Sequence, residues 1–342
     1  MHRISFALFF ALNAMSLAAG ADEAQDAYKR GDYVTAFSKF ASAAKTGDGE
    51  AMYYVGRMYR DGQGVERNYR EALDWYRQAA EKGNSKAMLD LGKVYAFGMG
   101  VPVDYAAALK WYGLAADKGE GEAMHNLGVM YEQGLGVRTD YSLAAKWYRM
   151  ASDKGEAWAM TNLGHLFEAG RGVPVDYAEA MKWYRAASDK GDVDATLNIA
   201  RLYSKGLGIR HDEREAMTWL RKAADAGSGE AMRLLGAHYF EGDGVAKDRT
   251  EAVRWHLRAA AHGDTLSMKY LAEMYKRGQG VPKDLVQAYA FAALAMERMP
   301  PGPEKNREVL PLLLNITQDL SKEERERGEQ LKAELSKGIE SR

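Results

Sequence analysis

The chain of 342 residues contains no cysteine and only 7 prolines, and its charges almost cancel. Without cysteine it can form no disulfide framework, thiolate zinc site, catalytic thiol or lipid-anchored N-terminal cysteine. The 47 Lys and Arg against 48 Asp and Glu give a net charge of -1. This balance argues against nucleic acid as a partner, because gripping a phosphate backbone requires a positive excess. Because disulfides and thiolate metal sites are excluded, the stability of the fold must come from packing.

Long apolar runs are also absent, except at the N-terminus. Residues 1–21 join a positive tip at Arg3 to an apolar stretch from Ile4 to Ala19, and Ala19-Gly20-Ala21 forms a cleavage pattern. These features predict a signal peptide, with the uncleaved anchor as the alternative. We expect a mature chain from Asp22 that is not inserted in a membrane and is periplasmic or secreted in a bacterium.

Motifs that carry catalysis or cofactor binding are missing as well. The glycine pairs have no third glycine at the dinucleotide-binding spacing, and there is no Gly-Lys-Ser/Thr, HExxH or GxSxG pattern. His125 and His165 could approach each other as a metal pair, but without a carboxylate in ligand spacing we interpret them as solvated. We therefore expect no cofactor, no metal site and no enzyme activity.

A repeat of 36 residues dominates the remainder of the chain. Glycines recur at this step at Gly47, Gly83, Gly119, Gly155, Gly191, Gly227 and Gly263, and pairs such as Gly134/Gly136 keep the same step from Gly62/Gly64 to Gly278/Gly280. Tryptophans follow at Trp75, Trp111, Trp147, Trp183, Trp219 and Trp255. A sustained period of this length indicates a solenoid.

Each unit has the pattern of two amphipathic helices. Met124, Leu127, Gly128 and Tyr131 form one apolar stripe, and Ala144, Trp147, Tyr148 and Ala151 form a second after the Gly134/Gly136 turn. We name these helix A and helix B. The position of the tryptophans in the second stripe favours packing over a carbohydrate-binding platform.

Short polar residues stand where each helix B begins. They are Asn68, Asp104, Asp140, Asp176, Asp212, Asp248 and Asp284, and five of them have a Glu or Gln three residues later. This spacing predicts N-caps with the pattern of capping boxes.

These units resemble the Sel-one-like repeat (SLR) family, which is related to tetratricopeptide repeats. The resemblance rests on Ala123 to Tyr131, Gly134-Leu135-Gly136-Val137, Asp140, and Ala145-Lys146-Trp147-Tyr148 through Gly155. It implies an all-α, right-handed superhelical solenoid of seven repeats over residues 50–299 that serves as an adaptor. Residues 22–49 are interpreted as an N-terminal tetratricopeptide-like cap and residues 300–342 as a C-terminal helical cap.

Partner specificity is expected on the helix A positions outside the core stripe, because these face the inner groove in related solenoids. One row of such positions reads Tyr54, Asp90, Asn126, Asn162, Asn198, Leu234 and Tyr270, and another reads Arg57, Lys93, Val129, His165, Arg201, Ala237 and Glu273. We select Tyr54, Arg57, Asp90, Lys93, Asn126, Asn162, His165, Asn198, Arg201 and Tyr270 as the candidate groove. The three asparagines could bind the amide backbone of an extended peptide, although asparagine could also be the common residue at that position.

The sequence thus predicts an exported, monomeric scaffold that binds a protein or extended peptide along this groove. A cell-wall or polysaccharide ligand is the main alternative within binding functions. Hydrolase activity on envelope material is the alternative enzyme function, and a host protein is a further candidate partner.

Overall fold

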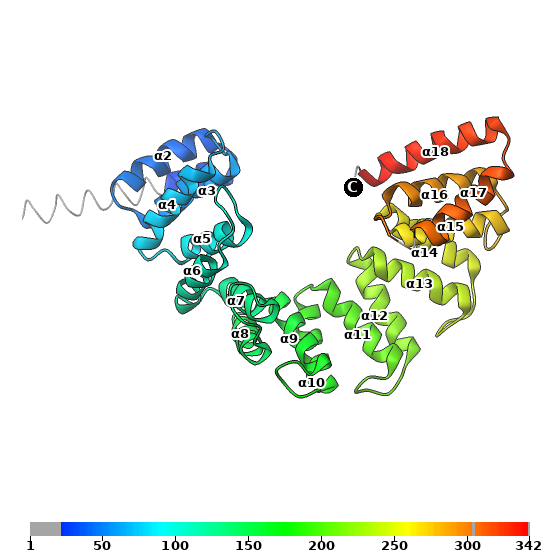
Figure 1. Ribbon diagram of the computed structural model, residues 1–342, viewed down its shortest axis with the longest axis horizontal. Helices are drawn as coiled ribbons and strands as arrows, with labels where there is room; N and C mark the ends of the chain where they lie inside the picture. Colours follow the sequence, from blue (N-terminus) through cyan, green and yellow to red (C-terminus); the bar gives the residue numbers. More distant parts are fainter. Residues whose placement is uncertain (1–21, 303–304, 341–342) are drawn as a thin grey trace, which may run out of the picture. The chain divides into compact units, whose positions relative to one another are not determined.

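The computed structural model describes residues 22–302 and 305–340. Every regular element in these residues is helical, and the helices follow one another in pairs (Figure 1), which confirms the predicted all-α array. The predicted signal peptide, residues 1–21, lies outside the described residues. The chain divides into two compact units, residues 1–175 (unit 1) and residues 176–342 (unit 2), which we describe separately.

Unit 1 contains the N-terminal helices, three complete helix pairs and helix A of the fourth repeat. Residues 22–29 are helical. The helices that follow are α2 (Tyr33–Lys45), α3 (Gly49–Asp61), α4 (Tyr69–Glu81), α5 (Ser85–Phe97), α6 (Tyr105–Asp117), α7 (Gly121–Gln133), α8 (Tyr141–Asp153) and α9 (Ala157–Ala169).

Unit 2 contains helix B of the fourth repeat, three complete pairs and the C-terminal helices. They are α10 (Tyr177–Asp189), α11 (Val193–Lys205), α12 (Glu213–Asp225), α13 (Gly229–Glu241), α14 (Arg249–Ala261), α15 (Thr265–Arg277), α16 (Leu285–Arg298), the π-helical turn η1 (Lys305–Val309), α17 (Leu310–Gln318) and α18 (Lys322–Glu340). Within the described residues, no helix combines the length and apolarity needed to span a membrane.

The predicted N-caps of the B helices form, but the predicted capping boxes form only in part. Asp104 accepts a hydrogen bond from the main-chain N–H of Ala107 at 2.9 Å. Its own N–H donates to the carbonyl of Tyr95 on helix A, at 2.9 Å, and so needs no side-chain acceptor. Asn68 and Asp248 are held in the same way by Tyr59 and Tyr239. In the boxes of Asn68 and Asp248, the main chain of helix A therefore takes the place of the reciprocal side-chain bond.

Helix A and helix B of a pair meet through a glycine and an aromatic ring. A Cβ atom on Gly92 would lie 2.3 Å from the ring of Tyr112, so only glycine fits at this contact. The fully buried aromatic residue of helix B is thus the tyrosine that follows the tryptophan. Of the tryptophans that recur every 36 residues, Trp255 is buried and the others are half-buried, which supports packing as their role.

Successive pairs are joined by the second glycine of each turn. Gly172 has a φ of 69°, and a Cβ atom there would lie 2.2 Å from the main-chain carbon of Tyr141, the first residue of the preceding helix B. Ser142 adds a hydrogen bond from its Oγ to the Gly172 oxygen at 3.1 Å. The second glycine of each pair therefore packs against the neighbouring repeat, and it also helps the chain to turn within its own repeat.

The C-terminal segment covers the last repeat. Helix α17 has Pro311 in its first turn, where a missing N–H costs nothing, and Ile316 is buried in the core of unit 2. A complete capping box opens α18, because Ser321 Oγ accepts from Glu324 N at 3.2 Å and Glu324 Oε2 accepts from Ser321 N at 2.9 Å.

Candidate partner-binding site

Tyr54 and Arg57, the first pair of candidate residues, contact the N-terminal helices. The ring of Tyr54 stacks on Phe40 with centroids 4.6 Å apart, and its hydroxyl accepts from Gln25 at 3.2 Å. The Arg57 guanidinium lies 5.7 Å from the centroid of the Tyr28 ring. These two residues therefore support the junction between the first repeat and the preceding helices.

Asp90 and Lys93 belong to a charge network across three repeats. Asp90 is buried and accepts from Arg60 of the preceding repeat at 3.2 Å. Lys93 lies 3.7 Å from Asp90 and 2.7 Å from Glu122 of the next repeat. Burial raises the pKa of the Asp90 carboxyl, and the two cations oppose this effect. The network connects helices α3, α5 and α7 electrostatically.

Asn162 and His125 form a polar contact between α7 and α9. The Asn162 amide nitrogen lies 3.1 Å from His125 Nε2, so the amide donates and Nε2 accepts. Burial lowers the pKa of His125, which keeps this nitrogen available as an acceptor. Asn126 is half-buried next to His125, and His165 is exposed on α9. The predicted peptide clasp by these asparagines stays a prediction.

Trp158 is an exposed residue beside this contact. It is 66% exposed, and its ring centroid lies 6.3 Å from that of His125. Trp158 is not among the predicted groove residues, because it stands outside the 36-residue series of tryptophans. The corresponding positions in the other repeats are mostly charged: Glu50, Lys86, Glu122, Asp194, Glu230 and Leu266. A tryptophan at a position that is usually charged was therefore the signal in the sequence for this exposed residue.

Asn198 and Arg201 bind each other on α11 in unit 2. The Arg201 guanidinium donates to Asn198 Oδ1 at 3.0 Å, and both side chains are half-buried.

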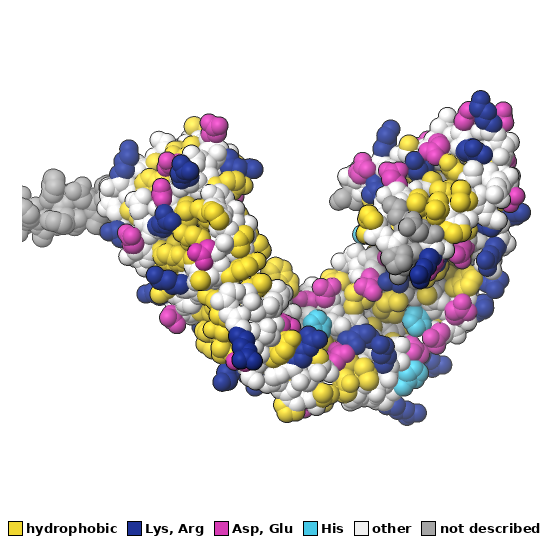
Figure 2. All heavy atoms as spheres, viewed as in Figure 1, with side chains coloured by type: hydrophobic (Ala, Val, Ile, Leu, Met, Phe, Trp, Pro, Cys, Tyr) yellow, Lys and Arg dark blue, Asp and Glu magenta, His cyan; other side chains and the backbone are white. Residues whose placement is uncertain are grey.

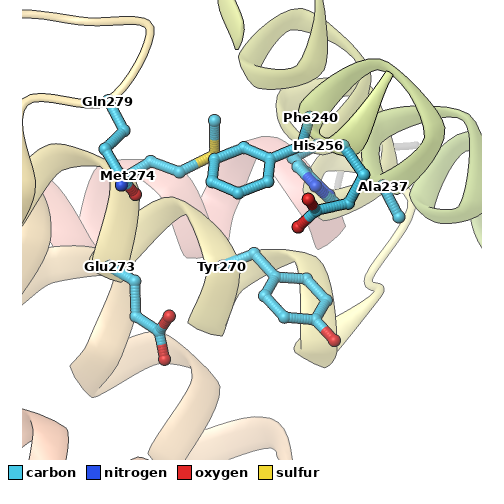
Figure 3. A pocket seen from close by; sticks show the side chains of 8 residues that line it. Ala237, Phe240, His256, Tyr270, Glu273, Met274 and Gln279 are labelled. Atoms are coloured by element: carbon cyan, nitrogen blue, oxygen red, sulfur yellow. The ribbon is translucent and has the colours of Figure 1, made fainter. Parts of the chain in front are cut away.

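Tyr270 lines a cleft of about 280 Å³ between the A helices α13 and α15. Figure 3 shows Phe240, Met274 and Tyr270 around it, and His256 of α14 at its base. The cleft exists partly because Ala237 is small where other repeats carry Arg57, Lys93 or His165. Glu273, from the second predicted row, and Glu241 add two carboxylates to its lining.

Glu241 and Glu273 give this cleft two acidic side chains, and the chain's own cations lie near two of its rings. Arg249 and Lys247 lie 5.2 and 6.0 Å from the centroid of the Phe240 ring, and Lys269 lies 5.2 Å from that of Tyr270. Both lysines of α15 contact the C-terminal segment, since Lys269 pairs with Glu308 and Lys276 donates to Asn315. Neither Glu241 nor Glu273 has an ion-pair partner in the described part of the chain. Burial lowers the pKa of His256 to about 4, so this imidazole is neutral near pH 7 and adds no positive charge.

Further hydrophobic side chains are exposed on unit 1. Phe97 is 73% exposed and Val103 is 51% exposed, both at the turn between α5 and α6. Figure 2 shows hydrophobic side chains gathered over α4 to α6 on the face in view. This surface could add contact area to a partner of unit 1.

Comparison with known proteins identifies the repeat. The model of the Sel1 repeat matches residues 49–84, 85–120, 121–156, 159–192, 193–228, 229–264 and 265–298. The chain therefore belongs to the Sel1 repeat family, as the resemblance to Sel-one-like repeats predicted. Proteins of this family generally mediate protein–protein interactions and are typically non-catalytic.

Three solved structures are similar to the chain. A Sel1 repeat protein from Oxalobacter formigenes shares 33% identity with a TM-score of 0.65, covering 70% of this chain and 98% of that one. A protective antigen of uropathogenic Escherichia coli with an SLR fold shares 25% identity with a TM-score of 0.48, covering 96% and 86%. Yeast Tom70 shares 11% identity with a TM-score of 0.50, covering 83% and 60%, which concerns the fold alone. The comparison with curated proteins gave no match.

Proposed function

We propose that this chain is an exported scaffold that binds a protein partner through the exposed faces of its A helices. The observation that carries the proposal is the cleft between α13 and α15, whose lining includes Ala237, Tyr270 and Glu273 of the predicted groove rows. Export is supported by the composition of residues 1–21 alone.

The cleft suits a lysine or arginine side chain from an extended segment of the partner. The aliphatic part of such a side chain would pack on Met274 beside the Phe240 ring, which Arg249 and Lys247 also approach, while its charged end would reach Glu273 or Glu241. In unit 1, exposed Trp158 supplies an aromatic anchor for the same kind of interaction. The large number of such faces in a repeat protein allows modest contacts to add up.

The proposal can be tested by site-specific photocrosslinking of the full-length protein in the cells that produce it. A photoreactive residue replaces Gln279 at the edge of the cleft, and a matched control replaces Arg254, which is exposed on the B helix α14. Adducts are identified by mass spectrometry after separation of cytoplasmic, periplasmic and medium fractions.

We expect a defined protein adduct in the exported fraction when the probe is at position 279, and none when it is at position 254. Equal adducts at both positions would contradict the cleft as the binding surface. Recovery of glycan alone from position 279 would favour the polysaccharide alternative, and retention in the cytoplasm would contradict export.

A further inference from the structure

Three side chains that can bind metal ions meet at the junction between the fifth and sixth repeats. Glu213 is the first residue of α12, His238 lies in the last turn of α13, and Asp243 follows in the next turn. One ligand atom from each of these three lies within 4.8 Å of the other two. His211 is a neighbour of this group, because its Nε2 lies 3.1 Å from Glu213 Oε1.

The other repeats show that packing does not require these residues. The position of His238 is otherwise apolar, with Met58, Val94, Met130, Leu166, Leu202 and Met274. The position of Glu213 otherwise holds Tyr69, Tyr105, Tyr141, Tyr177, Arg249 and Leu285, and that of Asp243 holds Gln63, Met99, Leu135, Arg171, Leu207 and Gln279. Three departures from the repeat therefore coincide at one place in space.

The Glu213 carboxylate is incompletely satisfied by the protein. Its Oε1 accepts from Ser204 Oγ at 2.8 Å and contacts His211, but its Oε2 is buried and has no hydrogen-bond partner in the described residues. His238 Nδ1 lies 3.7 Å from the Asp243 carboxylate and 3.1 Å from the main-chain oxygen of Asp243, so its other ring nitrogen, Nε2, is the one left for a metal ion. No lysine or arginine pairs with either carboxylate in the described part of unit 2. A buried carboxylate oxygen without a donor is costly, and a cation at this position would remove the cost.

We propose that Glu213, His238 and Asp243, with His211 as a fourth ligand, bind a divalent transition-metal ion such as Zn²⁺. Two imidazoles and two carboxylates suit zinc, whereas calcium and magnesium prefer oxygen ligands throughout. Glu213 and His211 come from the fifth repeat, and His238 and Asp243 from the sixth. The ion would link two neighbouring repeats and stabilise their junction, beside the cleft that Ala237 and Glu241 of the same helix line.

The repeats themselves provide substitutions that should preserve folding. His238→Met restores the residue found at positions 58, 130 and 274, and Asp243→Gln restores the residue found at positions 63 and 279. His262→Gln is the matched control, because His262 is exposed at the end of α14, away from the four ligands in sequence. Circular dichroism establishes that each variant is folded.

The experiment is a calorimetric titration of Zn²⁺ into the full-length protein, purified without a histidine tag and stripped with a chelator. We expect one equivalent to bind and the thermal midpoint to rise with Zn²⁺. His238→Met should weaken binding by about 100-fold or more, because loss of a residue that only orients a ligand already costs about 10- to 100-fold, and His262→Gln should bind like the wild type. Absence of Zn²⁺ binding, equal affinity in the His238→Met variant, or an equal affinity for Mg²⁺ would overturn the proposal.

Discussion

A Cβ atom on Gly128 would lie 2.5 Å from the ring of Tyr148, so the two residues share one space between helix A and helix B. The same relation joins Gly56 to Tyr76 and Gly236 to His256. Where helix A carries alanine instead, the partner on helix B is smaller: Leu220 opposes Ala200, and Ala292 opposes Ala272. A larger side chain on helix A is thus matched by a smaller one on helix B, so the contact between the two helices stays closely packed.

Gly128→Ala should therefore destabilise the protein by about 1–3 kcal/mol, since the added methyl group overpacks the contact. Urea denaturation followed by circular dichroism measures this change. The control is Gly113→Ala on α6, where no atom lies within 4 Å of the new Cβ. That variant should gain up to about 1 kcal/mol from helix propensity.

Adding Tyr148→Leu to Gly128→Ala recreates the Ala200–Leu220 combination and should recover part of the loss. Recovery is partial because Tyr148 also donates to Glu132 at 2.5 Å. A Gly128→Ala variant as stable as the wild type would contradict the shared-space account.

His256 should make the stability of the protein fall in acid. The side chain is 3% exposed, and burial lowers its pKa from 6.5 to about 4, with Asp264 and Arg233 acting in opposite directions. The unfolded chain therefore takes up a proton at a higher pH than the folded chain. Stability is full above pH 6.5 and declines as the pH falls towards 4, by about 3 kcal/mol in total.

The comparison for this prediction is the double variant His256→Tyr/Ser267→Ala. It restores the residues found in other repeats, such as Tyr148 and Ala159, and removes the His256–Ser267 hydrogen bond of 3.2 Å. Denaturant midpoints between pH 7 and pH 4 should fall less steeply for the variant. Parallel curves for both proteins would show that His256 is not the titrating group.

Two tryptophans should separate stability from binding. Trp255 is 8% exposed, and Trp255→Ala should cost about 3 kcal/mol or more. Trp158 is 66% exposed, and Trp158→Ala should leave the unfolding midpoint nearly unchanged while weakening partner capture. Unaltered capture by a folded Trp158→Ala protein would remove this residue from the binding surface.

Charge reversal in the cleft tests the expected basic ligand group. Glu273→Lys should reduce affinity for the crosslinked partner by about tenfold or more and leave the fold intact, since a like charge would face the partner's cation. Glu66→Lys, an exposed position in unit 1, makes the same change in net charge and should bind normally. Equal losses in both variants would point to net charge as the cause.

The fold could be predicted because glycine, aspartate and tryptophan perform the same structural task at every 36-residue step. The site could be predicted only in part, because binding groups are departures from that pattern. Tyr270 and Glu273 lie on the expected rows. Trp158 was not predicted, because the tryptophans that recur every 36 residues were the only ones considered as a pattern. Glu213, His238 and Asp243 have no ligand spacing along the chain, and only the helix pairing brings them together. The expectation of no metal site rested on spacing along the chain, and it stays a prediction beside the proposed zinc site.

The joint between repeats has a genetic consequence. Gly136 and Gly172 approach only the main chain and Cβ of the first residue of the preceding helix B, so the joint depends little on which side chain that residue carries. Duplication or loss of a 36-residue segment would recreate the same joint at the new boundary. A gene built in this way can lengthen or shorten its protein by recombination between its own repeats. The exposed residues of each remaining repeat can then change without altering the joint.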